Sequence, residues 1–153
     1  RDPERAKIEH QIAVGLQIFA GGLVAGLDAG FIYNSFPLMG GQLLPGEALA
    51  LSPAWLNHFE NAAMVQFQHR WLAILTLLGI VLFWQWGRRR APEGRARLAV
   101  HAVLATALTQ VGLGIATLLL VVPVSVAALH QAGALVLLSA LIWAGQVLRG
   151  QPD

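Results

Sequence analysis

Residues 60–86 read ENAAMVQFQHRWLAILTLLGIVLFWQW, an apolar stretch of membrane-spanning length that carries His69 followed at once by Arg70. An ionisable pair inside hydrocarbon costs free energy, so by default it marks a functional site. A second apolar stretch, residues 124–148, also carries one histidine, His130, at about the same distance from its own start. The central question is therefore whether the two histidines meet.

The composition is that of a membrane protein. Of the 153 residues, 56% are hydrophobic and only 12% are charged, and the mean hydropathy is +0.61. A soluble domain of this size cannot bury so much apolar surface, whereas a bilayer accepts it. The chain has no cysteine, which excludes disulfides, thiolate metal sites and cysteine nucleophiles. Because it starts at Arg1 without a methionine, we expect a processed product or part of a longer chain.

The apolar stretches predict an all-α fold, a polytopic membrane four-helix bundle that forms a single domain over residues 1–153. The four spans are expected at about residues 12–31, 62–86, 98–122 and 124–148. Residues 32–59 form a long, partly apolar loop, which is expected to cap the bundle at the membrane surface. In the first span, glycines 22, 26 and 30 form a smooth stripe that favours close packing of another helix or of a flat ligand, helix packing being the commoner case.

The basic residues predict the orientation of the bundle. Except for Arg70, all Lys and Arg residues lie before the first span, in residues 87–97 or at Arg149, and the 32–59 loop has none. By the positive-inside rule, both termini are cytoplasmic and the long loop is outside. The same distribution argues against nucleic-acid binding, because the basic residues mark helix ends and do not cover a face.

In this topology the 62–86 and 124–148 spans run in the same direction. His69 and His130 each lie about seven residues into their spans, roughly 10 Å below the outer surface at about 1.5 Å per residue. Two histidines at matched depth on parallel helices fit axial coordination of a haem iron from opposite sides of the porphyrin. The alternative is that each histidine only makes a hydrogen bond between helices. Zinc is disfavoured, because a clustered third ligand is lacking.

Three neighbours complete the predicted site. Arg70 is expected near the outer interface, where it could pair with a haem propionate. Gln66 and Gln131 are expected to hydrogen-bond around the histidine ligands. The other histidines, at positions 10, 58 and 101, are expected to be solvated or interfacial.

Three separated segments then resemble the haem A synthase family, and they occur in the family's order. They are GGLVAGLDAGFIYNSFPLMGG (21–41), FENAAMVQFQHR (59–70) and ALHQAGALVLL (128–138). The resemblance implies an eight-helix oxidoreductase of haem A biosynthesis, made of two four-helix halves. It oxidises the methyl group of haem O to the formyl group of haem A, the cofactor of terminal oxidases. This chain resembles the C-terminal half, for which the resemblance implies that His69 and His130 are the axial ligands of an electron-passing haem b.

One departure from the family concerns catalysis. The family's other half carries an E-x-x-H motif with the catalytic glutamate, whereas residues 66–69 of this chain read QFQH. The catalytic residues therefore stay unassigned. We expect either a portion of a longer enzyme or two copies that together mimic the two halves.

The resemblance also implies partners and a location. Expected partners are the substrate haem O, membrane lipid, the N-terminal half of the same enzyme or a second copy, and haem O synthase or terminal oxidase assembly factors. The expected location is the bacterial cytoplasmic membrane or the mitochondrial inner membrane. Two alternatives stay open: a four-helix cytochrome b that only carries electrons, and a structural membrane assembly protein.

Overall fold

The computed structural model describes residues 3–149 of the chain, and the side chains of residues 11–148. Four long helices form the bundle: α1 (Pro3–Gly26), α3 (Ala62–Arg90), α4 (Arg95–Leu119) and α5 (Val124–Arg149). Four short helical elements lie between α1 and α3: η1 (Ala29–Phe31), η2 (Gly46–Leu49), η3 (Ala54–Leu56) and α2 (Asn57–Glu60). Residues 3–149 contain no strand, and the prediction of an all-α helical bundle is confirmed.

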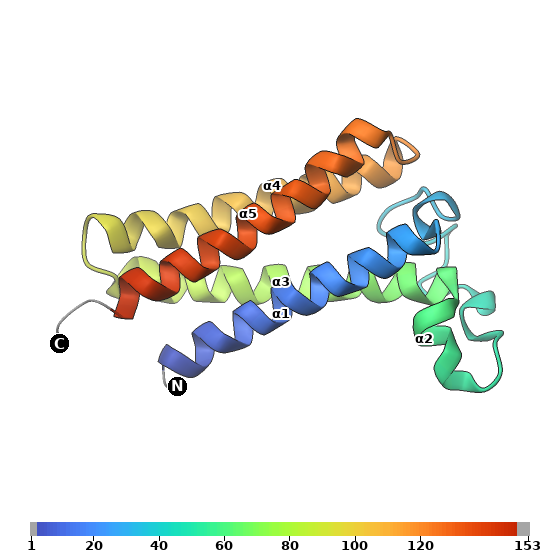
Figure 1. Ribbon diagram of the computed structural model, residues 1–153, viewed down its shortest axis with the longest axis horizontal. Helices are drawn as coiled ribbons and strands as arrows, with labels where there is room; N and C mark the ends of the chain where they lie inside the picture. Colours follow the sequence, from blue (N-terminus) through green and yellow to red (C-terminus); the bar gives the residue numbers. More distant parts are fainter. Residues whose placement is uncertain (1–2, 150–153) are drawn as a thin grey trace.

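The long helices pack in a ring in which α1 contacts α3, α3 contacts α4, α4 contacts α5, and α5 contacts α1. The start of α1, the end of α5 and the α3–α4 connection lie at one end of the bundle (Figure 1). The segment between α1 and α3 and the α4–α5 turn lie at the other end, which we call the outer end. The helices α3 and α5 therefore run in the same direction. The predicted cytoplasmic ends, residues 1–2 and 150–153, lie outside the described residues.

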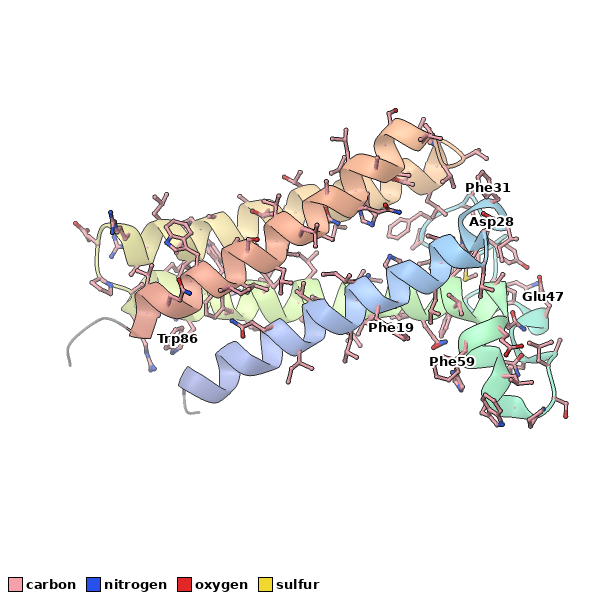
Figure 2. The ribbon with its side chains drawn as sticks, viewed as in Figure 1. Phe19, Asp28, Phe31, Glu47, Phe59 and Trp86 are labelled. Carbon is pink, nitrogen blue, oxygen red and sulfur yellow. The ribbon has the colours of Figure 1, made fainter. Side chains whose placement is uncertain are left out.

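The outer faces of the helices are apolar. Within the described residues, α3, α4 and α5 are each long and apolar enough to cross a membrane, and α1 contributes a shorter apolar segment, Gln11–Gly26. On α3, Leu75, Leu78 and Leu82 are 55–60% exposed, and Figure 2 shows Phe19 on the outside of α1. Exposing such side chains to water costs free energy, whereas the hydrocarbon of a bilayer accepts them. The chain is a membrane protein.

The first helix ends earlier than the sequence indicates. α1 stops at Gly26, five residues before the expected end of the span. The reason is Asp28, whose backbone is left-handed (φ 52°) and therefore cannot continue a right-handed helix. The chain then forms η1, and the Asn34 side chain donates hydrogen bonds to the carbonyls of Gly30 and Leu118. These bonds hold the segment that follows α1 against the outer end of α4.

An asparagine fixes the start of α3. The Asn61 side-chain oxygen accepts hydrogen bonds from the backbone N–H groups of Ala63 and Met64, as an N-cap does. Its amide donates to the backbone carbonyl of Glu47 and to the side chain of Asn57. Asn57 is buried and in turn bonds the backbone of residue 51. The outer segment is thus a folded cap that holds the first turn of α3, and this sets the height of the residues that follow.

The apolar core fills the end of the bundle opposite the cap. Phe83, Val100, Val103 and Leu141 are buried there, from α3, α4 and α5. The helices α3 and α4 approach closely because residue 87 is glycine: a Cβ there would lie 2.8 Å from the Val100 side chain. Towards the outer end this packing gives way to a cavity.

Candidate functional site

A cavity of about 670 Å³ lies between the four long helices and η1. Its volume is in the range of small-molecule and cofactor sites. The lining is mostly apolar, and it contains all five residues that the sequence predicts for the site. The polar and small residues of the lining include Gln17, Gly21, Gln66, His69, Arg70, Gln110, Gly114, His130 and Gln131.

The structure brings the two predicted histidines together across this cavity. His69 is seven residues after the first residue of α3, and His130 is six residues after the first residue of α5. Because the two helices run in the same direction, the rings reach a similar depth. Their centroids are 6.4 Å apart and their planes are nearly perpendicular, at 89°.

This spacing fits a metal held between the two rings. A metal–imidazole nitrogen bond is about 2 Å long, and the distance from that nitrogen to the ring centre adds about 1 Å on each side, so two axial rings have centroids about 6 Å apart. Within residues 3–149, no group of three or more His, Asp or Glu residues could hold a metal ion. Two imidazoles at this spacing could hold a metal whose other ligands come from elsewhere, such as the four nitrogens of a porphyrin.

Two glycines make room for the imidazoles. A Cβ on Gly21 of α1 would lie 3.1 Å from Cε1 of His69, and one on Gly114 of α4 would lie 2.9 Å from Cε1 of His130. The contact at Gly114 is closer than real Cβ atoms show, and the contact at Gly21 would require the His69 ring to shift by a few tenths of an ångström. By contrast, Gly22 and Gly26 face open space in this structure. Of the stripe formed by glycines 22, 26 and 30, only Gly30 is tightly packed, against Val122, and the glycine that lies against the His69 ring is Gly21.

Two glutamines that the sequence analysis did not single out contact the histidines. Nε2 of Gln17 lies 3.1 Å from Nδ1 of His69 and 3.1 Å from its backbone oxygen. Nε2 of Gln110 donates to the backbone oxygen of His130 at 2.5 Å. A signal for them exists in the sequence: residues 17–21 and 110–114 both follow the pattern Q-x-x-x-G, each on the helix that packs against a histidine helix.

Arg70 connects the cavity to the outer cap. Its Nη1 donates to the backbone oxygen of Ser35 at 2.7 Å, and its Nη2 donates to the backbone oxygen of Tyr33 at 2.8 Å and to the Gln66 side chain. Nε of Arg70 is buried and has no partner. The guanidinium therefore pins the loop above the cavity and keeps one N–H free.

The predicted glutamines do not touch the histidine rings. Gln66 is buried, and its side chain bonds Arg70 and the backbone oxygen of Tyr33, because residues four apart share a helix face. Gln131 lines the cavity. Among the described side chains, neither makes a hydrogen bond to His69 or His130.

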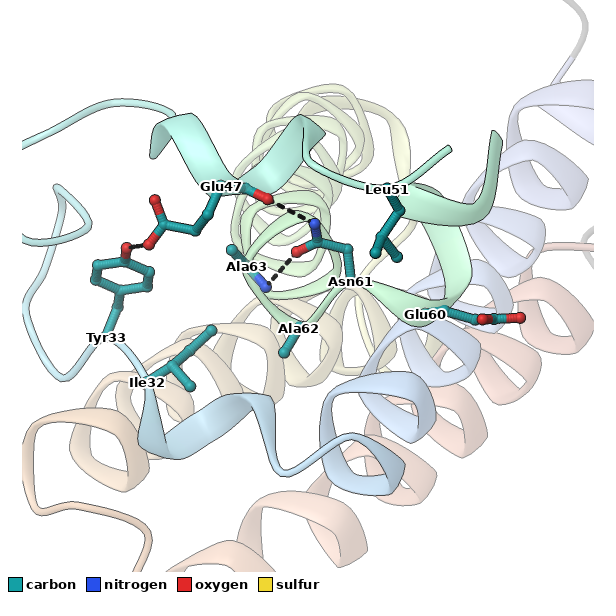
Figure 3. A pocket seen from close by; sticks show the side chains of 8 residues that line it. All are labelled: Ile32, Tyr33, Glu47, Leu51, Glu60, Asn61, Ala62 and Ala63. Atoms are coloured by element: carbon teal, nitrogen blue, oxygen red, sulfur yellow. Dashed lines mark hydrogen bonds between the residues drawn. The ribbon is translucent and has the colours of Figure 1, made fainter. Parts of the chain in front are cut away.

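The other histidines whose side chains are described, and the cap carboxylates Glu47 and Glu60, lie outside the cavity lining. His101 accepts a hydrogen bond from Trp84 at 2.9 Å, His58 lies in α2, and the side chain of His10 is outside the described residues. A second pocket, of about 450 Å³, lies in the outer cap beside Glu60 (Figure 3). There the Tyr33 hydroxyl donates to the Glu47 carboxylate. This bond lowers the pKa of Glu47 and raises the pKa of Tyr33.

Comparison with known proteins agrees with the earlier resemblance. The family model of the cytochrome oxidase assembly protein, COX15-CtaA, matches residues 7–142. The "Heme A synthase" of Rhodospirillum centenum is 51% identical over 137 residues, which are 89% of this chain and 36% of that protein. The human "Heme A synthase COX15" is 46% identical over 139 residues, 91% of this chain and 34% of that protein.

The chain thus spans about a third of the length of these relatives. No solved structure matches it. The family match covers most of the chain, including both histidines and both Q-x-x-x-G segments. The chain belongs to the COX15-CtaA family of cytochrome oxidase assembly proteins.

Proposed function

We propose that this chain is the haem-binding, electron-transferring part of a heme A synthase and corresponds to its C-terminal half. The observation that carries the proposal is the pair of imidazoles, 6.4 Å apart across a cavity between helices of the same direction. A bound haem b would supply a one-electron Fe(III)/Fe(II) couple. His69 and His130 would be its axial ligands.

The other residues of the cavity have complementary tasks. The apolar lining excludes water and lowers the local dielectric, which influences the potential of a bound haem. Arg70 closes the outer side by holding the loop backbone, and its free Nε–H is available to a propionate. The unpartnered Nε–H of Arg70 at the outer end supports a haem oriented with its propionates towards the cap.

For the complete enzyme we propose oxidation of the methyl group of haem O to the formyl group of haem A, with haem O as substrate. The position three residues before His69, where the family's other half has a glutamate, is Gln66. Its side chain is occupied by Arg70 and the backbone oxygen of Tyr33. This chain therefore relays electrons, and the oxidation takes place in the N-terminal half of the enzyme or in a second copy.

The proposed orientation places the basic end of the bundle in the cytoplasm or mitochondrial matrix. The arginines of residues 88–97 lie at the end where α1 starts and α5 finishes, and the outer cap has no basic residue between positions 32 and 59. The proposed location is the bacterial cytoplasmic membrane or the mitochondrial inner membrane. Haem O synthase and terminal oxidase assembly factors are the proposed partners.

The test is an optical spectrum of the purified, haem-loaded protein before and after reduction. We expect a sharp reduced α-band that disappears in His69→Ala and in His130→Ala. The matched control is His101→Ala, which removes a histidine bonded to Trp84 outside the cavity. A band that survives both ligand variants contradicts the proposal, and a colourless wild-type protein favours a structural membrane protein.

A second candidate function is a cytochrome b that only carries electrons. It is favoured by the scarcity of acidic groups in the cavity that could take part in an oxidation. Of the described residues that line the cavity, Asp28 is the one carboxylate, and it lies at the outer end next to η1. Incubation with haem O, followed by extraction and mass analysis of the haem, separates the two functions. Formation of haem A in membranes that contain the complete enzyme, and its loss in the His130→Ala enzyme, supports the synthase role. An unaffected yield supports an independent carrier.

A further inference from the structure

The end of the bundle opposite the cap carries a concentrated positive charge. Residues 87–97, which end α3 and begin α4, contain five arginines and one glutamate. Arg97 pairs with this glutamate, Glu93, at 3.1 Å. The other four arginines are exposed, and among the described side chains they have no carboxylate partner: Arg88, Arg89, Arg90 and Arg95. This end of the bundle therefore has more positive charge than its own described acidic groups balance.

Two of the exposed arginines lie over tryptophan rings. Cζ of Arg88 is 4.8 Å from the centroid of the Trp84 ring, and Cζ of Arg90 is 5.8 Å from that of Trp86. The members of each pair are four residues apart on α3, where side chains share a helix face. A ring contacts the flat face of a guanidinium, so the N–H groups at its edge stay available to an anion.

The tryptophans also place the arginines at a membrane interface. Tryptophan is enriched where the apolar core of a bilayer meets the headgroups, because its ring is apolar and its N–H is polar. Trp86 lies at the end of the bundle opposite the cap (Figure 2), on a helix long and apolar enough to cross a membrane. The arginines at positions 88–90 extend about one turn further along α3. Their side chains therefore reach the layer that contains the lipid phosphates.

We propose that the exposed arginines at the α3–α4 connection bind the headgroups of anionic phospholipids of the surrounding bilayer. A guanidinium forms two parallel hydrogen bonds with a phosphate, and basic clusters directly after a transmembrane helix attract anionic lipids. The inference is independent of the haem proposed above. The competing explanation is that these arginines only orient the chain during insertion. In that case the folded protein has no preference between anionic and zwitterionic lipids.

The test is native mass spectrometry of the purified protein in micelles that contain equal amounts of phosphatidylglycerol, which is anionic, and phosphatidylcholine, which is zwitterionic. We expect the wild-type protein to retain phosphatidylglycerol preferentially. Arg88→Gln and Arg90→Gln should each reduce this preference about fivefold, as expected for one basic residue beside anionic lipid. Both positions are exposed, and each variant keeps four arginines in residues 87–97, so folding and orientation should be unchanged.

The matched control is Arg97→Gln, which changes the net charge equally but removes an arginine that is already paired with Glu93. It should reduce the preference by less than Arg88→Gln does. Trp84→Leu keeps every arginine and removes the ring beneath Arg88, so it should weaken the preference about twofold. Equal retention of both lipids by the wild-type protein, or equal losses in Arg88→Gln and Arg97→Gln, would overturn the inference. So would displacement of phosphatidylglycerol by an equal concentration of inorganic phosphate, because the cluster would then be a site for free phosphate.

Discussion

The helix pairs α1–α3 and α4–α5 place their histidines at similar depths, but different contacts hold the two residues. On α3, the ring of His69 is contacted by Gln17, and the following residue, Arg70, is fastened to the outer loop. On α5, Gln110 bonds only the backbone of His130, whose Nδ1 has no partner. If the pair holds a haem as proposed, this difference predicts that His69 is fixed before the haem binds and that His130 adjusts to it.

The largest effect should come from filling the space beside the rings. Gly114→Ala and Gly21→Ala place a Cβ at 2.9 and 3.1 Å from His130 and His69, so the rings must move and haem affinity should fall about tenfold. The loss should be larger for Gly114→Ala, where the contact is shorter. Haem titration of the purified variants measures both effects.

The matched controls are Gly112→Ala and Gly15→Ala, on the same two helices and outside the cavity lining. A Cβ at either position meets nothing within 4 Å. Because alanine is about 1 kcal/mol more favourable than glycine in a helix, these variants should keep their affinity and be slightly more stable. Equal affinities in all four variants would show that the glycines do not make room for the ligands.

A smaller effect is expected from Arg70, the residue of α3 that bonds the backbone of the outer loop. Arg70→Leu removes the side-chain donor of the Ser35 backbone oxygen and one of the two side-chain donors of the Tyr33 backbone oxygen, the other being Gln66; hydrogen bonds from a charged group contribute about 1.5–3 kcal/mol. Hydrogen exchange of residues 33–38 should then be about tenfold faster or more. The equivalent change on α5, Gln131→Leu, should leave exchange in this segment unchanged. Similar exchange in both variants would mean that Arg70 does not hold the loop.

The smallest effect concerns the Tyr33–Glu47 bond in the cap. The pKa of Glu47 is lowered by this bond, so its contribution is present above the ordinary value of 4.5 and is lost as the pH falls through the lowered folded value. For Tyr33 the pKa is raised, so the contribution is present below 10 and is lost as the pH rises through the raised value. Limited proteolysis of the cap should be at most about threefold faster in Tyr33→Phe at pH 7, as expected for an exposed pair. The difference from wild type should shrink as the pH falls through the lowered pKa of Glu47, and a difference that stays constant on acidification would contradict this assignment.

The sequence predicts the helices and the meeting of the histidines well, because both depend on patterns along single helices. Apolar length identifies the spans, and the alternation of long helices and connections gives their relative directions, whereas the orientation in the membrane from charge stays a prediction. The matching depths of His69 and His130 then follow by counting residues. By contrast, α1 ends before the expected end of the first span, because hydropathy does not reveal the left-handed backbone at Asp28.

The surroundings of the histidines were harder to predict, because they depend on how the helices are rotated against each other. Gln66 and Gln131 are near the histidines in sequence but make no hydrogen bond to the rings, whereas Gln17 and Gln110 reach the histidine residues from neighbouring helices. Similarly, the sequence does not predict that the Nη atoms of Arg70 bond carbonyls of the outer loop, and its pairing with a propionate stays a prediction. Composition and spacing along one helix do not predict contacts between helices. The repeated Q-x-x-x-G pattern nevertheless indicates α1 and α4, the helices that carry Gln17 and Gln110.

The electron paramagnetic resonance spectrum of the ferric, haem-loaded protein tests the central claim most directly. Two imidazoles on one iron give a low-spin signal, and nearly perpendicular rings, as found here at 89°, give a strongly anisotropic one. We predict this signal in the wild-type protein and its conversion to a high-spin signal, or its loss with the haem, in His69→Ala and in His130→Ala. A high-spin wild-type signal, or a low-spin signal that survives either substitution, would contradict axial ligation by this pair.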